Sequence, residues 1–199
     1  LRGTGSKDVI AHEVAVPRGH AIDTRQLFRG ESPHNRAHST PVYRLSPEAM
    51  LANSVATAVL GSAQFALERF IQRTRERKVI LTGASKAEHG PTQLRLAEAA
   101  LEVQSAELLL EQNFADFDAL MNSADPAGVE PRVRVKWRAA YAAELCRRAA
   151  TRLFSGSGAH AVYEPSPLQA AFRNINVGAQ HASIDFDTAA EQYGRLRLR

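Results

Sequence analysis

Four long stretches of this chain repeat apolar residues at helical spacing, and no other feature limits the fold as strongly. We expect helices over residues 46–78, 92–121 and 131–154, and a fourth helix that includes residues 168–193. The breaks between these stretches are short, and short connections favour antiparallel neighbours. The sequence therefore predicts a mainly α protein, an antiparallel four-helix bundle.

The first of these helices has a clear start and a cationic end. Ser46 can cap it, and Pro47 suits the first helical position. Near its end Arg69, Arg73 and Arg77 follow one another at every fourth position and share one face. Cations at a helix C-terminus complement the helix dipole, which is a purely structural interpretation. A phosphate-binding cluster is the functional alternative.

The fourth helix is predicted to carry a small polar site at the edge of the core. Asn174, Gly178, His181 and Asp185 follow at spacings of three or four beside an unbroken apolar stripe. Glycine is costly inside a helix unless something uses the space it leaves. His181 one turn later, with Asp185 to hold its ring, suggests acid–base or hydrogen-bonding chemistry near neutral pH. A histidine that merely hydrogen-bonds within the bundle is the alternative.

The N-terminal part has a different character. The β-branched residues and alternation of residues 8–16 predict a strand that Pro17 ends, and residues 18–45 predict a long loop. A Gly/Ser-rich loop that contains Gly156 and Gly158 leads into the fourth helix. Such a loop allows close approach of a ligand to the backbone.

Composition excludes several classes of function. The chain has 199 residues, is 44% hydrophobic and carries a formal charge of +4, as expected for a globular protein with a core. Aromatic residues are not interleaved with basic runs, so no nucleic-acid partner is expected. No run is long and apolar enough to predict a membrane span, and we expect a cytoplasmic protein. Its one cysteine, Cys146, and its scattered histidines predict no disulfide and no metal site.

Three stretches together resemble a known family. ALERFIQRTRERK ends at Arg77 and Lys78, QLRLAEAA begins at Gln93, and GSGAHAVYEPSPLQAAFRN leads to His181. They resemble the C-terminal part of the acyl-CoA dehydrogenase fold, and most closely its two-component flavin-dependent monooxygenases. That group includes 4-hydroxyphenylacetate 3-hydroxylase oxygenase components, a steroid-ring hydroxylase and dibenzothiophene monooxygenase. The resemblance implies that residues 1–45 are the end of a central β-domain and a linker loop, and residues 46–199 the C-terminal helical bundle.

The resemblance also implies a cofactor and site residues. Reduced flavin, FMNH2 or FADH2, would come from a separate flavin reductase and react with O2 to give a C4a-hydroperoxyflavin. The cofactor-binding residues implied are Arg77, on the flavin phosphate, Gln93, Gly158 and Ala159. His181 would be catalytic and would contact a small aromatic, phenolic substrate together with Gly178. A homotetramer is implied as well.

Two other interpretations follow from the same residues. The chain could belong to an acyl-CoA dehydrogenase or to an N- or S-oxygenating enzyme of the same fold. In the dehydrogenases this region commonly supplies a glutamate base, and the aligned position here is Ala182, which favours the oxygenase. The other alternative is a non-catalytic helical interaction domain.

Overall fold

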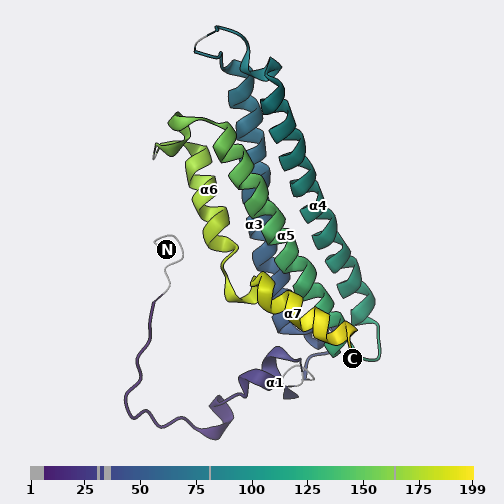
Figure 1. Cartoon of the computed structure of the whole chain (residues 1–199). Coiled ribbons are helices and arrows are strands. Elements are labelled where there is room, and N and C mark those ends of the chain that lie inside the picture. The colour runs from purple at the N-terminus through teal and green to yellow at the C-terminus, as the bar shows by residue number, and fades with distance from the viewer. Residues whose placement is uncertain (1–6, 31, 34–36, 81, 164) are drawn as a thin grey trace.

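The computed structural model describes residues 7–30, 32–33, 37–80, 82–163 and 165–199, and it shows an elongated helical bundle (Figure 1). Three long helices run side by side, and shorter elements cover one face and one end. The long helices are α3 (Pro47–Glu76), α4 (Gly90–Met121) and α5 (Val129–Gly156). The shorter α-helices are α1 (Thr24–Phe28), α6 (Pro167–Gly178) and α7 (Phe186–Arg197). The 3-10 turns are η2 (Arg18–His20), η3 (Pro41–Arg44), η4 (Lys86–Glu88), η5 (Ala159–Val162) and η6 (Ala182–Ile184).

The predicted four-helix bundle is confirmed, with α6 in the fourth position. Helices α3, α4 and α5 begin and end close to the bounds expected from the sequence. Ser46 caps α3 as predicted, because its hydroxyl accepts from the backbone N–H of Ala49 at 3.5 Å, and Pro47 occupies the first position. Helix α6 packs against both α3 and α5.

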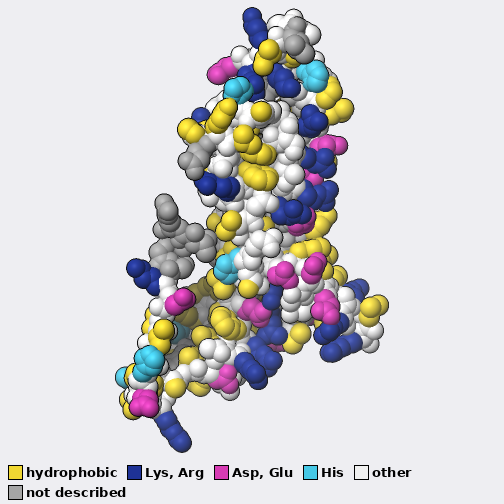
Figure 2. Space-filling model, turned by 60° about the vertical axis from the view of Figure 1, so that its left-hand side comes forward, with side chains coloured by type: hydrophobic (Ala, Val, Ile, Leu, Met, Phe, Trp, Pro, Cys, Tyr) yellow, Lys and Arg dark blue, Asp and Glu magenta, His cyan; other side chains and the backbone are white. Residues whose placement is uncertain are grey.

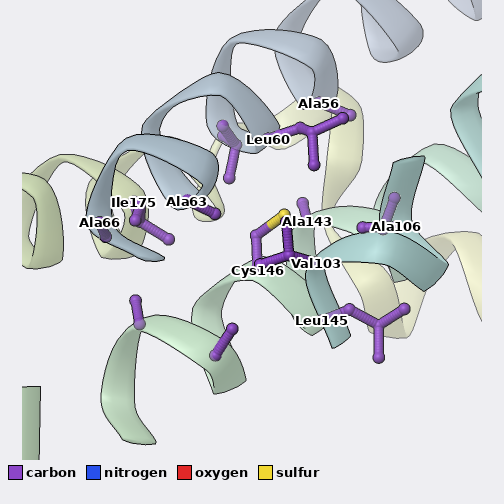
Figure 3. Packing of buried hydrophobic residues seen from close by; sticks show 14 of the residues in the cluster. Ala56, Leu60, Ala63, Ala66, Val103, Ala106, Ala143, Leu145, Cys146 and Ile175 are labelled. Carbon is purple, nitrogen blue, oxygen red and sulfur yellow. The ribbon is translucent and has the colours of Figure 1, made fainter. Parts of the chain in front are cut away.

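Small residues let the helices approach closely in the core. Figure 3 shows alanines of α3, α4 and α5 that meet around Cys146, with Leu60, Val103 and Ile175 between them. Alanine adds little volume and favours the helix, so backbones can pack closely without a cavity. Burial raises the pKa of the Cys146 thiol to about 12, so this cysteine stays protonated and serves packing.

Helix α4 has apolar residues on two opposite faces. Ala99, Val103 and Leu110 are buried in the core. Leu101 and Leu108, at 64% and 59% exposed, lie on the outer face. The seven-residue spacing of this outer stripe keeps it in line along the helix. This chain alone does not bury it.

The single long fourth helix predicted from the sequence is wrong. Helix α6 ends at Gly178, and α7 begins only at Phe186 and crosses the lower end of the bundle (Figure 1). Between them His181 has extended backbone angles, φ −66° and ψ 131°, and Asp185 caps α7. The four polar residues at helical spacing therefore do not share a helical face.

The strand predicted at residues 8–16 is also wrong. This segment runs without a partner, and its side chains are exposed (Figure 1). A strand needs a neighbour to receive its backbone hydrogen bonds, and no described segment of the chain lies beside it. The predicted loop 18–45 contains short helical turns. In the described residues β pairing is limited to one isolated antiparallel bridge, between Lys78 and Ser85.

Helix α3 combines great length with apolar composition. By these two properties alone it is the one helix of the described chain that could cross a membrane, with a mean hydropathy of 1.3 over an 18-residue window. Here α3 packs against α4, α5 and α6, and it supplies Ala52, Ala56 and Phe70 to the core. The same composition is what a helix in the middle of a bundle needs.

Candidate functional site

A pocket of about 510 Å³ lies where the end of α5 meets the turn that follows α3. Four cations line it: Arg77, Lys78, Lys86 and Arg95. The remaining lining residues are Val79, Ile80, Ser155, Gly156, Ser157 and Gly158. No carboxylate is among the described residues that line it, so an anionic ligand would meet positive charge on several sides.

Local backbone structure holds Arg77 in this pocket. Arg77 is the C-cap of α3, and its carbonyl accepts a hydrogen bond from the Lys86 N–H at 2.8 Å. One guanidinium nitrogen, Nη1, donates to the Ser157 carbonyl at 2.8 Å. Arginine has five N–H donors, so most of them remain for a ligand. The contact joins two segments that lie 80 residues apart in sequence.

Gly158 is required for its backbone conformation. Its φ of +74° lies where residues with side chains are rarely found. A Cβ built there would lie 3.9 Å from Arg77 Nη1, an ordinary contact, so space is not the constraint. Ala159 follows directly as the first residue of η5. The structure therefore places Arg77 and Gly158 in the lining of one pocket, with Ala159 next in the chain, and their role in cofactor binding stays a prediction.

Gln93 lies close to this pocket in sequence but is not part of its lining. It occupies the first turn of α4, is exposed, and donates from Nε2 to the Ala87 carbonyl at 3.0 Å. Arg95, two residues later, lines the pocket instead. The sequence indicates Lys78 as a neighbour of the Arg77 cluster, whereas sequence reasoning missed Lys86 and Arg95. The signal for them was charge in the segments that flank Arg77 and Gln93.

His181 lies at the turn between α6 and α7, exposed in this chain. Its Nδ1 is 2.8 Å from the Ser183 hydroxyl oxygen and accepts from the Ser183 backbone N–H at 3.2 Å. A backbone N–H can only donate, so Nδ1 is the acceptor. In the neutral ring the proton then sits on Nε2, which can donate to a substrate oxygen. Ser183 was not predicted.

Asp185 does not orient His181, contrary to the prediction from spacing. Its carboxylate accepts from the Thr188 N–H at 3.0 Å and caps α7. Hydrogen bonds from Thr188 lower the pKa of this carboxyl, and the charge of Lys136 adds to the effect. A carboxylate with a lowered pKa is a weak base. The physical reason is the break after Gly178, which gives Asp185 the role of a helix cap.

Gly178 permits close contact between α6 and α3. A Cβ at this position would lie 2.8 Å from Val59 Cγ2, closer than real Cβ atoms approach. Val59 is 4% exposed and β-branched, so it has little freedom to move away. The space that Gly178 leaves is therefore occupied by Val59. The substrate contact expected for Gly178 stays a prediction.

The two groups of site residues lie at opposite ends of α6. Gly158 precedes this helix and His181 follows it, and its 12 residues span about 18 Å. Figure 2 shows Lys and Arg side chains spread along the bundle, including over its upper part, where α3 finishes. The structure therefore forms one site from Arg77 and the glycine loop, and a separate one from His181.

Comparison with known families decides the relationship. A family model described as the acyl-CoA dehydrogenase C-terminal domain matches residues 53–186. The chain belongs to this family. The matched residues include α4, α5, α6, most of α3 and the turn that carries His181.

Proteins that the chain is similar to include enzymes named as hydroxylases. The chain is 31% identical to a pigment production hydroxylase of Rhodococcus sp. over all of its length and 51% of that protein. It is 28% identical to the oxygenase component of p-hydroxyphenylacetate 3-hydroxylase of Acinetobacter baumannii over 98% of its length and 46% of that protein. The crystal structure of 3-HSA hydroxylase from Rhodococcus sp. RHA1 superposes with a TM-score of 0.86 at 25% identity, covering 99% of this chain and 51% of that one. The chain thus spans about half the length of the curated relatives it matches.

Proposed function

We propose that the protein is the oxygenase component of a two-component flavin-dependent monooxygenase that hydroxylates a small phenolic substrate. The observation that carries the proposal is the turn between α6 and α7. It presents an imidazole, His181, and its nearby carboxylate, Asp185, is engaged as a helix cap. Similarity to named aromatic hydroxylases supports the same activity.

The pocket at Arg77 fits the phosphate of a flavin. When bound, reduced flavin supplies the electrons that activate O2. Arg77 would hold the phosphate, and the backbone of Gly158 and Ala159 would approach it closely. Lys86 and Arg95 add positive charge, and the described lining adds no negative charge. Gln93 would contribute a polar group at the rim.

His181 would act on the substrate through Nε2. With Nδ1 held by Ser183, Nε2 carries the proton and donates to the phenolic oxygen. Such a hydrogen bond stabilises the phenolate that forms when the phenol releases its proton to solvent, and the phenolate has more electron density at the ortho carbon than the phenol. The geometry therefore favours a donor over a base at Nε2.

An acyl-CoA dehydrogenase activity fits the turn less well. Removal of a substrate α-proton requires a base, and the resemblance to the dehydrogenases implies that Ala182 stands at the position where they commonly carry a glutamate. Asp185 has a lowered pKa and is committed to Thr188. Acyl-CoA turnover with an artificial electron acceptor would overturn the oxygenase assignment.

Self-association would bring the two groups of residues to one cofactor. Arg77 and His181 are separated by the length of α6, so we place Arg77 on the flavin of a neighbouring subunit in a homotetramer. The outer stripe of α4, with Leu94, Leu101 and Leu108 exposed, supports an interface between copies. A separate reductase would deliver the flavin. Residues 1–45 would belong to the β-domain, and the cytoplasmic location stays a prediction.

The deciding experiment uses the full-length protein, a flavin reductase with NADH and a panel of phenols that includes p-hydroxyphenylacetate. We expect hydroxylated product from at least one phenol. His181→Ala should lower product formation about 100-fold while O2 consumption continues with release of H2O2. Equal product yields from the variant and the parent would remove His181 from this role.

A comparison of Arg77→Gln with His181→Ala tests whether the two ends of α6 have separate roles. Arg77→Gln should weaken binding of reduced FMN or FADH2 about tenfold, measured anaerobically, because a charge-assisted hydrogen bond is lost. At saturating flavin this variant should still convert O2 to product with the parent's efficiency. His181→Ala should bind flavin as the parent does. Loss of flavin binding in both variants would mean that the two residues do not have separate roles.

A further inference from the structure

A second cavity, of about 220 Å³, lies beside the first turn of α6. It is lined by Arg69, Gln72, Arg73, Glu76, Ser166, Pro167 and Leu168. None of these residues lines the Arg77 pocket. The cavity therefore lies between the cationic face of α3 and the N-terminus of α6. The proposed function assigns no role to it.

The N-terminus of α6 lacks the cap that its sequence offers. Ser166 is the N-cap residue, yet its hydroxyl makes no capping hydrogen bond. Ser166 is only 9% exposed, and its Oγ has no partner among the described residues. Pro167 has no N–H, and the Gln169 and Ala170 N–H groups donate to the Ser166 carbonyl, so this helix end attracts an anion through the positive end of its dipole. A buried hydroxyl without a partner costs free energy, so a missing ligand is a physical explanation.

Two arginines face the same cavity without a carboxylate partner. Arg69 donates to the Gln72 side chain at 3.1 Å and lies over the Phe65 ring. Arg73 makes no ion pair within the described residues, and Glu76, the one acidic residue in the lining, is exposed. Burial, and then the charge of Arg77, lowers the pKa of Arg73. An anion bound beside Arg73 would offset the repulsion between Arg73 and Arg77.

We propose that this cavity binds a phosphate group, held by the Arg73 guanidinium, the Ser166 hydroxyl and the N-terminus of α6. A phosphate offers several acceptor oxygens, so it can take hydrogen bonds from an arginine and a hydroxyl at the same time. The positive end of the α6 dipole favours the same negative charge. The site needs no flavin chemistry.

Two sources could supply this phosphate. It is either a free phosphate or phosphate monoester, or the second phosphate of FAD with the first at Arg77. The second source rests on the proposed function, and the first does not. Arg73 and Arg77 lie one helical turn apart, about 6 Å along α3, which places the two anion sites close together.

The test measures binding of inorganic phosphate to the full-length protein by calorimetry and by the midpoint of thermal unfolding. Arg73→Gln and Ser166→Ala should each weaken phosphate binding about tenfold. The control is Arg75→Gln, which removes the same charge from the same end of α3 at an exposed residue outside both cavities, and it should bind as the parent does. Equal losses in all three variants would reduce the site to diffuse charge and overturn the proposal.

Ser166→Ala carries a second, independent readout. Its hydroxyl has no partner, so without phosphate the variant should unfold at the parent's temperature or slightly above it. With phosphate the parent should gain stability by mass action, and the variant should gain less. A variant that is destabilised equally with and without phosphate would show a structural role for the hydroxyl and contradict the proposal.

Competition distinguishes the two sources. If the cavity takes the second phosphate of FAD, inorganic phosphate should weaken binding of FAD, and Arg73→Gln should weaken FAD and leave FMN unchanged. If the ligand is free, neither flavin should compete with phosphate. The phosphate measurement stands whether or not the protein hydroxylates a phenol, so failure of the proposed function and failure of this site are separate results.

Discussion

The two ends of α6 are built on different principles. At the upper end Arg77 and Arg73 lie without carboxylate partners, and the Ser166 hydroxyl is buried without an acceptor or donor among the described residues. At the lower end the polar groups satisfy one another, since His181 pairs with Ser183 and Asp185 caps α7. Charged and hydroxyl groups without partners are suited to bind a ligand. At the lower end the paired groups hold the His181 ring in place, so that its Nε2 is the atom left to meet a substrate.

Each end also depends on a glycine, for different reasons. Gly158 adopts a backbone conformation that other residues avoid, with room for a side chain. Gly178 has no positive φ but leaves no room, because Val59 occupies the space. A substitution at the first glycine tests conformation, and one at the second tests packing.

Gly178→Ala should destabilise the protein by about 2 kcal/mol, because the new methyl group overlaps Val59. Urea unfolding measures the change. The same substitution at Gly194, a helical glycine with nothing within 4 Å, should stabilise by about 1 kcal/mol. Combining Gly178→Ala with Val59→Ala should recover part of the loss, and a strictly additive double variant would contradict the packing argument.

Gly158→Ala should cost about 1 kcal/mol through its positive φ and should also weaken binding of reduced flavin. Gly83 is the control, since it has a φ of +66° and open space around it. Gly83→Ala should lose similar stability and keep flavin binding. Unfolding midpoints and anaerobic flavin titrations separate the two effects. Equal flavin binding in both variants would remove Gly158 from the cofactor site.

Ser183→Ala should lower product formation about threefold, because His181 loses the hydroxyl partner but keeps the backbone N–H at Nδ1. Ser183→Thr, which retains a hydroxyl, should restore most of the rate. Rescue by the conservative variant is the discriminating measurement: Ser183→Ala should lower kcat with KM unchanged, and Ser183→Thr should restore kcat. Equal kcat in Ser183→Ala and the parent would make Ser183 irrelevant to the histidine.

Asp185→Asn should cause a small loss of stability that depends on pH. Hydrogen bonds from Thr188 lower the carboxyl pKa in the folded state, so the carboxylate stabilises the fold above its unfolded pKa. This contribution is lost as the pH falls through the folded-state pKa, below the ordinary value of 3.8. Thermal midpoints of variant and parent should therefore differ at pH 7 and converge in acid. A constant difference would contradict the capping role.

Local sequence signals were enough to predict the bundle. Ser46 and Pro47 start α3 where expected, and the short breaks force the long helices to run antiparallel. Arg77 and Gly158 could be chosen from the resemblance of their surrounding residues, although they lie far apart in the chain. These signals act within a few residues and do not depend on what packs around them.

Only the tertiary structure decided where α6 ends and which atoms meet. Spacings of three and four continue from Leu168 to Tyr193, so periodicity alone does not reveal the break after Gly178. The position of Val59 against Gly178 depends on how α3 lies beside α6, which no local pattern encodes. Helical periodicity determines the direction in which a side chain points. Whether that direction meets a neighbour, a ligand or water depends on packing between distant segments, and that packing placed His181 in a turn beside Ser183.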